Sequence, residues 1–134
     1  EMCIRDRDLT ASFAQALAQH MLWQSQLTPP GGPEYFMQTA EVLAIFMGFG
    51  VMVTNSAYTF RGSCARCYNP RANRQASLSE SECVYALALF ADLKGVPRDN
   101  VLPYLKKYLR SAFKSAEKQL DKHPGTPHLR ELIR

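Results

Sequence analysis

Three of the four cysteines have a spacing that could support metal chemistry. Cys64 and Cys67 form a C-x-x-C pair, and Cys83 follows after 15 intervening residues, as in the first three ligands of a four-cysteine zinc site. No fourth ligand follows, and Cys83 shares a predicted helical face with Leu87 and Phe90, so a small buried thiol is the simpler explanation. The pair also lacks the tryptophan, proline and strand context of a thioredoxin-like redox motif. One hypothesis is therefore a small interaction module stabilised by zinc.

A second set of polar residues could bind a metal or transfer protons. His20, Glu34 and Glu41 are close in sequence, and Asn55 adds a further polar group. They could form the shifted or incomplete zinc site of a metal-dependent hydrolase. Each residue also has a structural interpretation. His20 on an apolar helix face is typical of a core histidine, Glu41 is either a paired buried acid or the last exposed residue before the core, and Asn55 can hydrogen-bond across helices.

The elements that must position these residues are helices. With 134 residues and 46% hydrophobic content, the chain can form one small domain with its own core. Its periodicity predicts an all-α fold of about four main helices, and no segment is a convincing strand. The first helix spans residues 8–26, where mostly apolar residues recur at spacings of three and four: Leu9, Phe13, Ala16, Leu17, His20, Met21 and Trp23 or Gln24.

The predicted second helix spans residues 34–57 and contains an uninterrupted apolar run at 42–53. This run of 12 residues is shorter than the roughly 20 that cross a bilayer, so we expect a buried core helix and no membrane span. A helix that is apolar on all sides needs neighbours on all sides, or leaves an interface open. Gly48 and Gly50 would let another helix backbone approach closely.

A long polar loop is predicted at residues 58–76, between the second and third helices. The third helix begins at a capping box, either Ser77 with Glu80 or Ser79 with Glu82, and ends at Gly95. The fourth helix, residues 100–122, has an apolar stripe made of Leu102, Leu105, Leu109, Phe113, Ala116 and Leu120. A last short turn could start at Thr126.

Positive charge is concentrated in two places. The net charge is +4, with four arginines in the long loop and six basic residues along the fourth helix: Arg61, Arg66, Arg71 and Arg74, then Lys106, Lys107, Arg110, Lys114, Lys118 and Lys122. Such a surface could meet phosphate. Glu117 and Asp121 interrupt the helical stripe, however, and no nucleic-acid-binding motif is present. A solvated helix face is the usual meaning of this pattern, so we do not expect nucleic acid as a partner.

The chain begins with Glu1 and not with a methionine, which is typical of a fragment that has lost its amino-terminal part. Residues 1–7 are predicted to be a disordered or non-native leader. The helical domain is expected at residues 8–125, followed by a carboxyl-terminal tail or short helix at 126–134.

Two segments, in this order, resemble an uncharacterised family of bacterial zincin-like helical proteins. Residues 40–58 read AEVLAIFMGFGVMVTNSAY, close to the family pattern T-D-L-L-A-V-F-L-G-F-G-I-F-x-A-N-S-A-F, and residues 78–90 read LSESECVYALALF, close to L-S-E-x-E-x-x-Y-A-L-A-L-F. In the family an A-H-E-L-A-H type helix precedes the first segment and a basic helix follows the second. The resemblance covers about residues 8–122 and implies a helical fold with a zinc site.

The catalytic residues that this resemblance implies are mostly replaced. Gln15 and Gln19 stand where the family has two zinc-binding histidines, and Ala16 stands where it has the general base. Met37 occupies the position of the acidic third ligand, and Glu41 is retained. An amide oxygen is a poor zinc ligand and alanine accepts no proton. Gln15 and Gln19 are otherwise an ordinary pair one helical turn apart.

These observations favour a non-catalytic, zincin-like helical scaffold or binding protein. The alternatives are the hydrolase with a shifted site and the zinc-stabilised cysteine module. We expect no cofactor, with zinc as the one alternative. The expected partner is an unidentified protein or the missing amino-terminal region, and free thiols suit a cytoplasmic protein.

Overall fold

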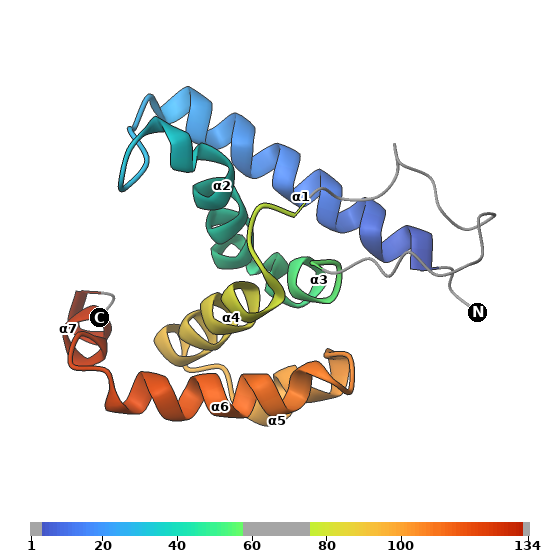
Figure 1. Ribbon diagram of the computed structural model, residues 1–134, viewed down its shortest axis with the longest axis vertical. Helices are drawn as coiled ribbons and strands as arrows, with labels where there is room; N and C mark the ends of the chain where they lie inside the picture. The colour runs from blue at the N-terminus through green and yellow to red at the C-terminus, as the bar shows by residue number, and fades with distance from the viewer. Residues whose placement is uncertain (1–3, 58–75, 133–134) are drawn as a thin grey trace.

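The computed structural model describes residues 4–57 and 76–132, with side chains described from residue 8 onward. Every regular element in these ranges is helical, which confirms the all-α prediction. In chain order the elements are α1 (Ile4–Ser25), η1 (Pro33–Tyr35), α2 (Phe36–Ala44), η2 (Ile45–Phe49), α3 (Gly50–Asn55), α4 (Glu80–Lys94), α5 (Arg98–Val101), η3 (Leu102–Tyr104), α6 (Leu109–Lys122) and α7 (Thr126–Leu132) (Figure 1). The element η2 is a π-helical turn, and η1 and η3 are 3-10 turns.

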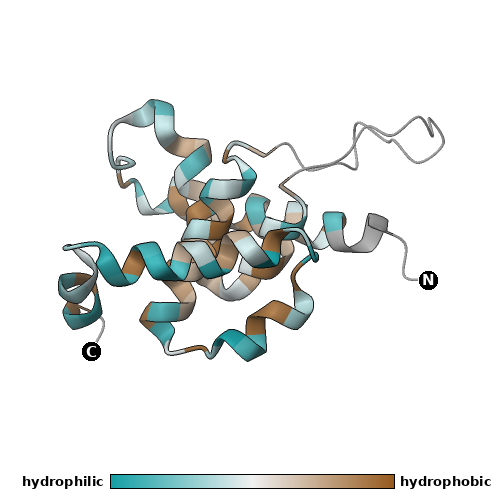
Figure 2. Ribbon diagram, turned by 60° about the horizontal axis from the view of Figure 1, so that its bottom comes forward, coloured by the Kyte–Doolittle hydropathy of each residue, from teal (hydrophilic) through white to brown (hydrophobic). Residues whose placement is uncertain are grey.

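The helix α4 lies in the middle of the fold. It packs against α6 on one side and against α3 and η2 on the other, while α1 packs on α2 and α3. Figure 1 shows α1 and α6 on opposite sides of α4. One continuous core joins these elements, with Ile45, Val84, Leu105 and Phe113 among its largest buried side chains. Figure 2 shows the apolar residues gathered on the helices at the centre.

The helix α1 is turned the opposite way from the orientation that its apolar stripe predicts. The large stripe residues lie at the surface, with Phe13 67% exposed and Trp23 76% exposed. The side that packs on α2 and α3 carries smaller or polar residues: Ala11, Ala14, Gln15, Ala18 and Leu22. Alanines on α1 let α2 approach closely, and Ala40 and Ala44 are fully buried on α2. The predicted apolar stripe is present on α1, but the described part of the chain leaves it exposed.

The predicted second helix is broken, because Gly48 has a left-handed backbone with φ 100 and ψ 1. A Cβ on Gly48 would meet nothing within 4 Å, so this glycine permits the bend and does not serve the close helix approach that we predicted. Gly50 does serve close packing. A Cβ there would lie 2.7 Å from Cδ1 of Leu87, which belongs to α4.

The segment Pro33–Asn55 is long and apolar enough to cross a bilayer by length and composition, although its uninterrupted apolar run is shorter. In this fold the segment contributes to the core, because Ala44, Ile45 and Val53 are fully buried. Its polar residues Glu41 and Asn55 hydrogen-bond to the segments that precede α4 and α6. These contacts tie the segment to the rest of the described fold.

The ends of α4 are those that the sequence predicts. Ser79 is the N-cap, and its hydroxyl accepts a hydrogen bond from the backbone N–H of Glu82 at 3.3 Å. The carboxylate of Glu82 in turn accepts from the backbone N–H of Ser79 at 2.7 Å, which completes the capping box. Gly95 ends the helix in a left-handed conformation with φ 64. Of the two capping boxes proposed from the sequence, the second is the one that forms.

The predicted fourth helix is interrupted before α6. The short elements α5 and η3 come first, and then Leu105 adopts an extended conformation with ψ 143. The apolar stripe is still directed inward, because Leu105, Leu109, Phe113 and Leu120 are buried. The final turn predicted at Thr126 is the helix α7. It is held to α4 by two hydrogen bonds from Arg130 to Asp92, at 2.6 and 2.8 Å.

Candidate functional site

Glu41 is fully buried on α2, and its carboxylate has defined partners. One oxygen accepts the backbone N–H of Ser77 at 2.9 Å, and the other accepts that of Leu78 at 2.7 Å. Hydrogen bonds to a charged group each contribute about 1.5–3 kcal/mol. Glu41 therefore ties α2 to the segment that leads into α4. Of its two structural interpretations, the paired buried acid is the one that the structure shows.

The other positions of the motif proposed from the sequence differ in their exposure. Gln15 is buried on the inner side of α1, whereas Ala16 is exposed and Gln19 is partly exposed. Met37, on α2, is 38% exposed. Gln15 and Glu41, the two buried residues of this set, carry an amide and a carboxylate, and both have hydrogen-bond or electrostatic partners.

The metal-binding groups predicted from the sequence are dispersed. His20 lies on the exposed face of α1, so its interpretation as a core histidine is wrong, and Glu34 is exposed in η1. Within residues 8–57 and 76–132, no three His, Cys, Asp or Glu side chains are placed to hold one metal ion. Cys83 is fully buried in α4. Cys64 and Cys67 lie outside the described residues.

Asn55 joins α3 to the extended turn before α6. It is 8% exposed, its side-chain Nδ2 donates to the carbonyl of Tyr104 at 2.8 Å, and its Oδ1 accepts from the backbone N–H of Lys106 at 2.9 Å. One carboxamide thus bonds the backbone on both sides of Leu105, where the helical pattern is interrupted. Thr54 donates to the carbonyl of Cys83 at 3.4 Å. These polar residues hydrogen-bond across helices, which agrees with their structural interpretation.

An apolar groove of ≈ 510 Å³ is open to solvent between α2, α4 and α6. It is lined by Val42 and Phe46 from α2 and η2, by residues of α4 and the segment before it, and by one residue of α6: Leu78, Ser81, Glu82, Tyr85, Ala86, Leu89 and Gln119. Phe46 packs edge to face on Phe90, with ring centroids 5.6 Å apart, which fixes the wall that Phe46 forms. Pockets of about 300–1,000 Å³ with mainly apolar walls are the usual form of ligand sites.

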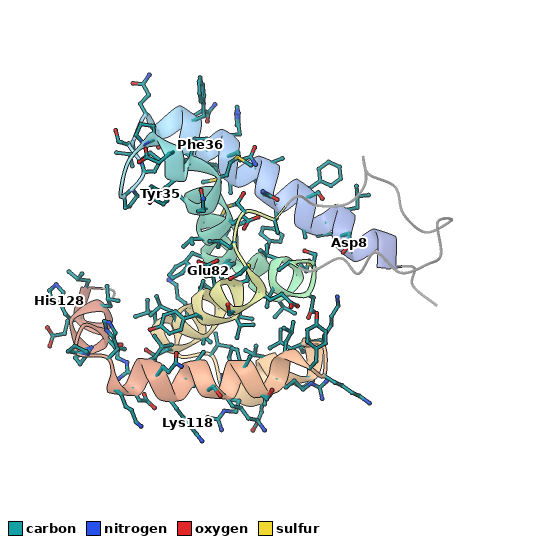
Figure 3. The ribbon with its side chains drawn as sticks, viewed as in Figure 1. Asp8, Tyr35, Phe36, Glu82, Lys118 and His128 are labelled. Atoms are coloured by element: carbon teal, nitrogen blue, oxygen red, sulfur yellow. The ribbon has the colours of Figure 1, made fainter. Side chains whose placement is uncertain are left out.

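The polar rim of this groove is acidic at one end. Glu82 lies there near the start of α4 (Figure 3). The backbone N–H and then the hydroxyl of Ser79 hold the pKa of Glu82 below its usual value of 4.5, so its carboxylate stays ionised near neutral pH. Nearby, the hydroxyl of Tyr108 donates to Glu80 at 2.6 Å and joins the start of α6 to α4. The groove therefore combines apolar walls with one exposed negative charge.

A second pocket, of ≈ 260 Å³, lies where α4, α5 and α6 meet, and its charges are paired with one another. Arg98 is 2.6 Å from Glu117, and Arg130 bridges Asp92 and Asp121 at 2.6 and 3.2 Å. These ion pairs join the elements around the pocket.

The basic residues of α6 lie on its outer side. Lys118 points away from the body of the protein (Figure 3), and Lys114 and Lys122 are exposed as well. Arg110 differs from them, because it donates to the carbonyls of Leu105 and Pro103 at 3.1 and 3.2 Å. The three lysines are therefore open to solvent in the described part of the chain. The four loop arginines lie outside the described residues.

The groove was not found by reasoning from chemically active residues, because its walls are ordinary apolar side chains. A signal was nevertheless present in the sequence. A second helix that is apolar on all sides predicts either full coverage or an open interface, and Val42 is 37% exposed in the groove. The comparisons with known proteins add no functional assignment. No protein-family model, curated protein or solved structure matches the chain significantly.

Proposed function

We propose that this protein is a non-catalytic binding protein whose groove between α2, α4 and α6 receives the apolar face of an amphipathic helix from a partner protein. The groove itself carries the proposal, because it combines apolar walls, an opening to solvent and one exposed carboxylate. A helix bound in such a groove places apolar anchors at spacings of three and four residues. It buries Val42 and the exposed edges of Phe46 and Tyr85.

The negative charge of Glu82 favours a partner helix that carries a positive charge. The carboxylate of Glu82 lies at the groove rim and stays ionised near neutral pH. A partner helix with a lysine or arginine beside its apolar face gains attraction there, whereas an acidic partner is disfavoured. The groove offers few polar groups to orient a small polar molecule, and its open form suits a protruding helix.

The proposed origin is a zincin-like protein that has lost its metal site. The motif resemblance supports this origin, and the contacts of Glu41 support the loss of catalysis. A general base must reach its substrate, but Glu41 is fully buried and both its oxygens accept backbone N–H groups. The retained acid then serves the fold, and binding is the proposed activity.

Peptide selection tests this proposal. The immobilised protein is screened against a library of random 16-residue peptides, of about the length that fills one helix-binding groove. The enriched peptides are expected to be amphipathic helices with a basic residue beside the apolar face. Their affinity is then compared for the wild type, for Val42→Lys and for Gln119→Trp, which changes an exposed groove residue.

Met52→Lys is the matched control, because Met52 is 41% exposed on α3 and Val42 is 37% exposed, yet Met52 does not line the groove. We expect the two groove variants to lose affinity by about tenfold or more and the control to retain it. Failure to enrich any peptide, or equal binding by all variants, contradicts the proposal.

A further inference from the structure

We propose that the exposed apolar face of α1 is a homodimer interface, on which α1 of a second copy docks in antiparallel orientation. The face is made of five large side chains that the described chain leaves exposed: Leu9, Phe13, Leu17, Met21 and Trp23. It lies opposite the side of α1 that packs on α2 and α3. Figure 1 shows that no other labelled helix covers this outer side. This interface is separate from the groove.

The composition of this region is that of an interface centre and not that of a solvated helix. Residues 9–33 contain no Asp, Glu, Lys or Arg, although charged residues are frequent elsewhere in the chain. Interface centres are depleted in charge and enriched in aromatic residues and methionine. A solvated helix face normally alternates charges, as the outer face of α6 does here.

The absence of charge also selects the occupant. A helix that lies on a membrane surface carries lysine or arginine along its polar side, whereas the basic residues of α1 are Arg5 and Arg7 in its first turn, with none between Leu9 and Ser25. A charged partner protein would lose solvation there without gaining an ion pair. A second copy presents the same uncharged, apolar face, so the two surfaces match in chemistry.

The spacing of the face suits pairing with itself. Leu9, Phe13, Leu17 and Met21 are four residues apart and form a ridge of the kind that packs into the matching groove of another helix. A two-fold axis near Ala16 makes the contact isologous, so that each copy contributes the same residues. Ala16 lies beside this ridge, and because it is exposed and small it leaves room for the second helix.

The available area is sufficient for a weak to moderate dimer. The exposed parts of the five residues amount to on the order of 600 Å² per copy, so that an interface burying all of them would cover about 1,200 Å², at the lower limit of stable interfaces. His20 and Gln24 lie among them and can hydrogen-bond across the interface. The expected dissociation constant is in the micromolar range.

Sedimentation equilibrium of the full chain tests the proposal, with protein from about 1 to 100 μM. The wild type is expected to approach twice the mass of one chain. Phe13→Lys and Leu17→Glu are each expected to raise the dissociation constant about 30-fold or more, because both bury an unpaired charge. Tyr104→Lys is the matched control, since Tyr104 is 69% exposed but lies in η3.

Circular dichroism melts separate the interface from the fold. Both α1 variants are expected to remain helical, since the replaced side chains are already exposed in one copy. If one variant does not fold, the other decides the outcome. A wild type that stays monomeric at the highest concentration, or a dimer that both variants leave intact, overturns the proposal. So does a monomer that binds anionic lipid vesicles through Phe13, because that result identifies a membrane as the occupant.

Discussion

Glu41→Gln separates a structural role for this acid from a catalytic one. The substitution keeps the size of the side chain but replaces one carboxylate oxygen with an NH2 group. The two oxygens now accept N–H groups of Ser77 and Leu78 at 2.9 and 2.7 Å. The amide can accept only one of them, and the other N–H then faces a donor in a partly buried site. Losing one charge-assisted bond and leaving a donor unsatisfied costs about 2–4 kcal/mol.

Urea unfolding followed by circular dichroism measures this difference in the free energy of unfolding. Glu34→Gln is the control, because Glu34 is exposed in η1 and its substitution is expected to change stability by less than about 0.5 kcal/mol. Acids held for catalysis often destabilise their fold, so that their neutralisation is neutral or stabilising. A Glu41→Gln variant as stable as the wild type, or more stable, refutes the structural role of Glu41.

Three further predictions concern the single residues Gly48, Glu82 and Gln38. Gly48→Ala should lower the free energy of unfolding by about 1–2 kcal/mol in urea melts, because φ 100 disfavours alanine although space is available; an unchanged stability would argue against the bend. Glu82→Gln should reduce the loss of stability on acidification. In the wild type, the lowered pKa of Glu82 stabilises the fold above pH 4.5, and this stabilisation is lost as the pH falls through the folded pKa. The melting temperatures of the variant and the wild type should therefore become more similar at acidic pH. Gln38→Met should stabilise the protein by about 1 kcal/mol in thermal melts, because Oε1 of Gln38 is buried without a hydrogen-bond partner in the described structure; destabilisation would contradict this.

Local signals predicted the ends of α4, whereas the predicted second and fourth helices are each interrupted. The capping box of Ser79 and Glu82 and the left-handed Gly95 were correctly placed, because each depends on residues within one or two turns. The inward stripe of α6 also followed from spacing alone. The interruption of the predicted fourth helix at Leu105 did not follow from spacing. It depends on Asn55, which hydrogen-bonds to the backbone on either side of Leu105 from 49 and 51 residues away in the chain. Such distant bonds leave no periodic signal.

The orientation of α1 shows a second limit. Periodicity identifies which side of a helix is apolar, but not whether the same chain covers it. Here Ala14 and Ala18 face the core while Phe13 is exposed, since close packing of helices can favour small residues. The candidate site shows the same limit. Glu41 was selected because a carboxylate can do chemistry, but it is bonded to backbone N–H groups. The groove has apolar walls, and a search for chemically active residues does not find such walls.

The most direct test of the proposed function is a map of backbone amide chemical shifts, recorded while a selected amphipathic peptide is titrated into the isotope-labelled protein. We expect the largest changes at Val42, Phe46, Tyr85 and Leu89, which line the groove from α2, η2 and α4. Val42→Lys is expected to abolish these changes and Met52→Lys to preserve them. Changes centred on Gln15 and Gln19, or spread over the surface without a centre in the groove, would overturn the proposed function.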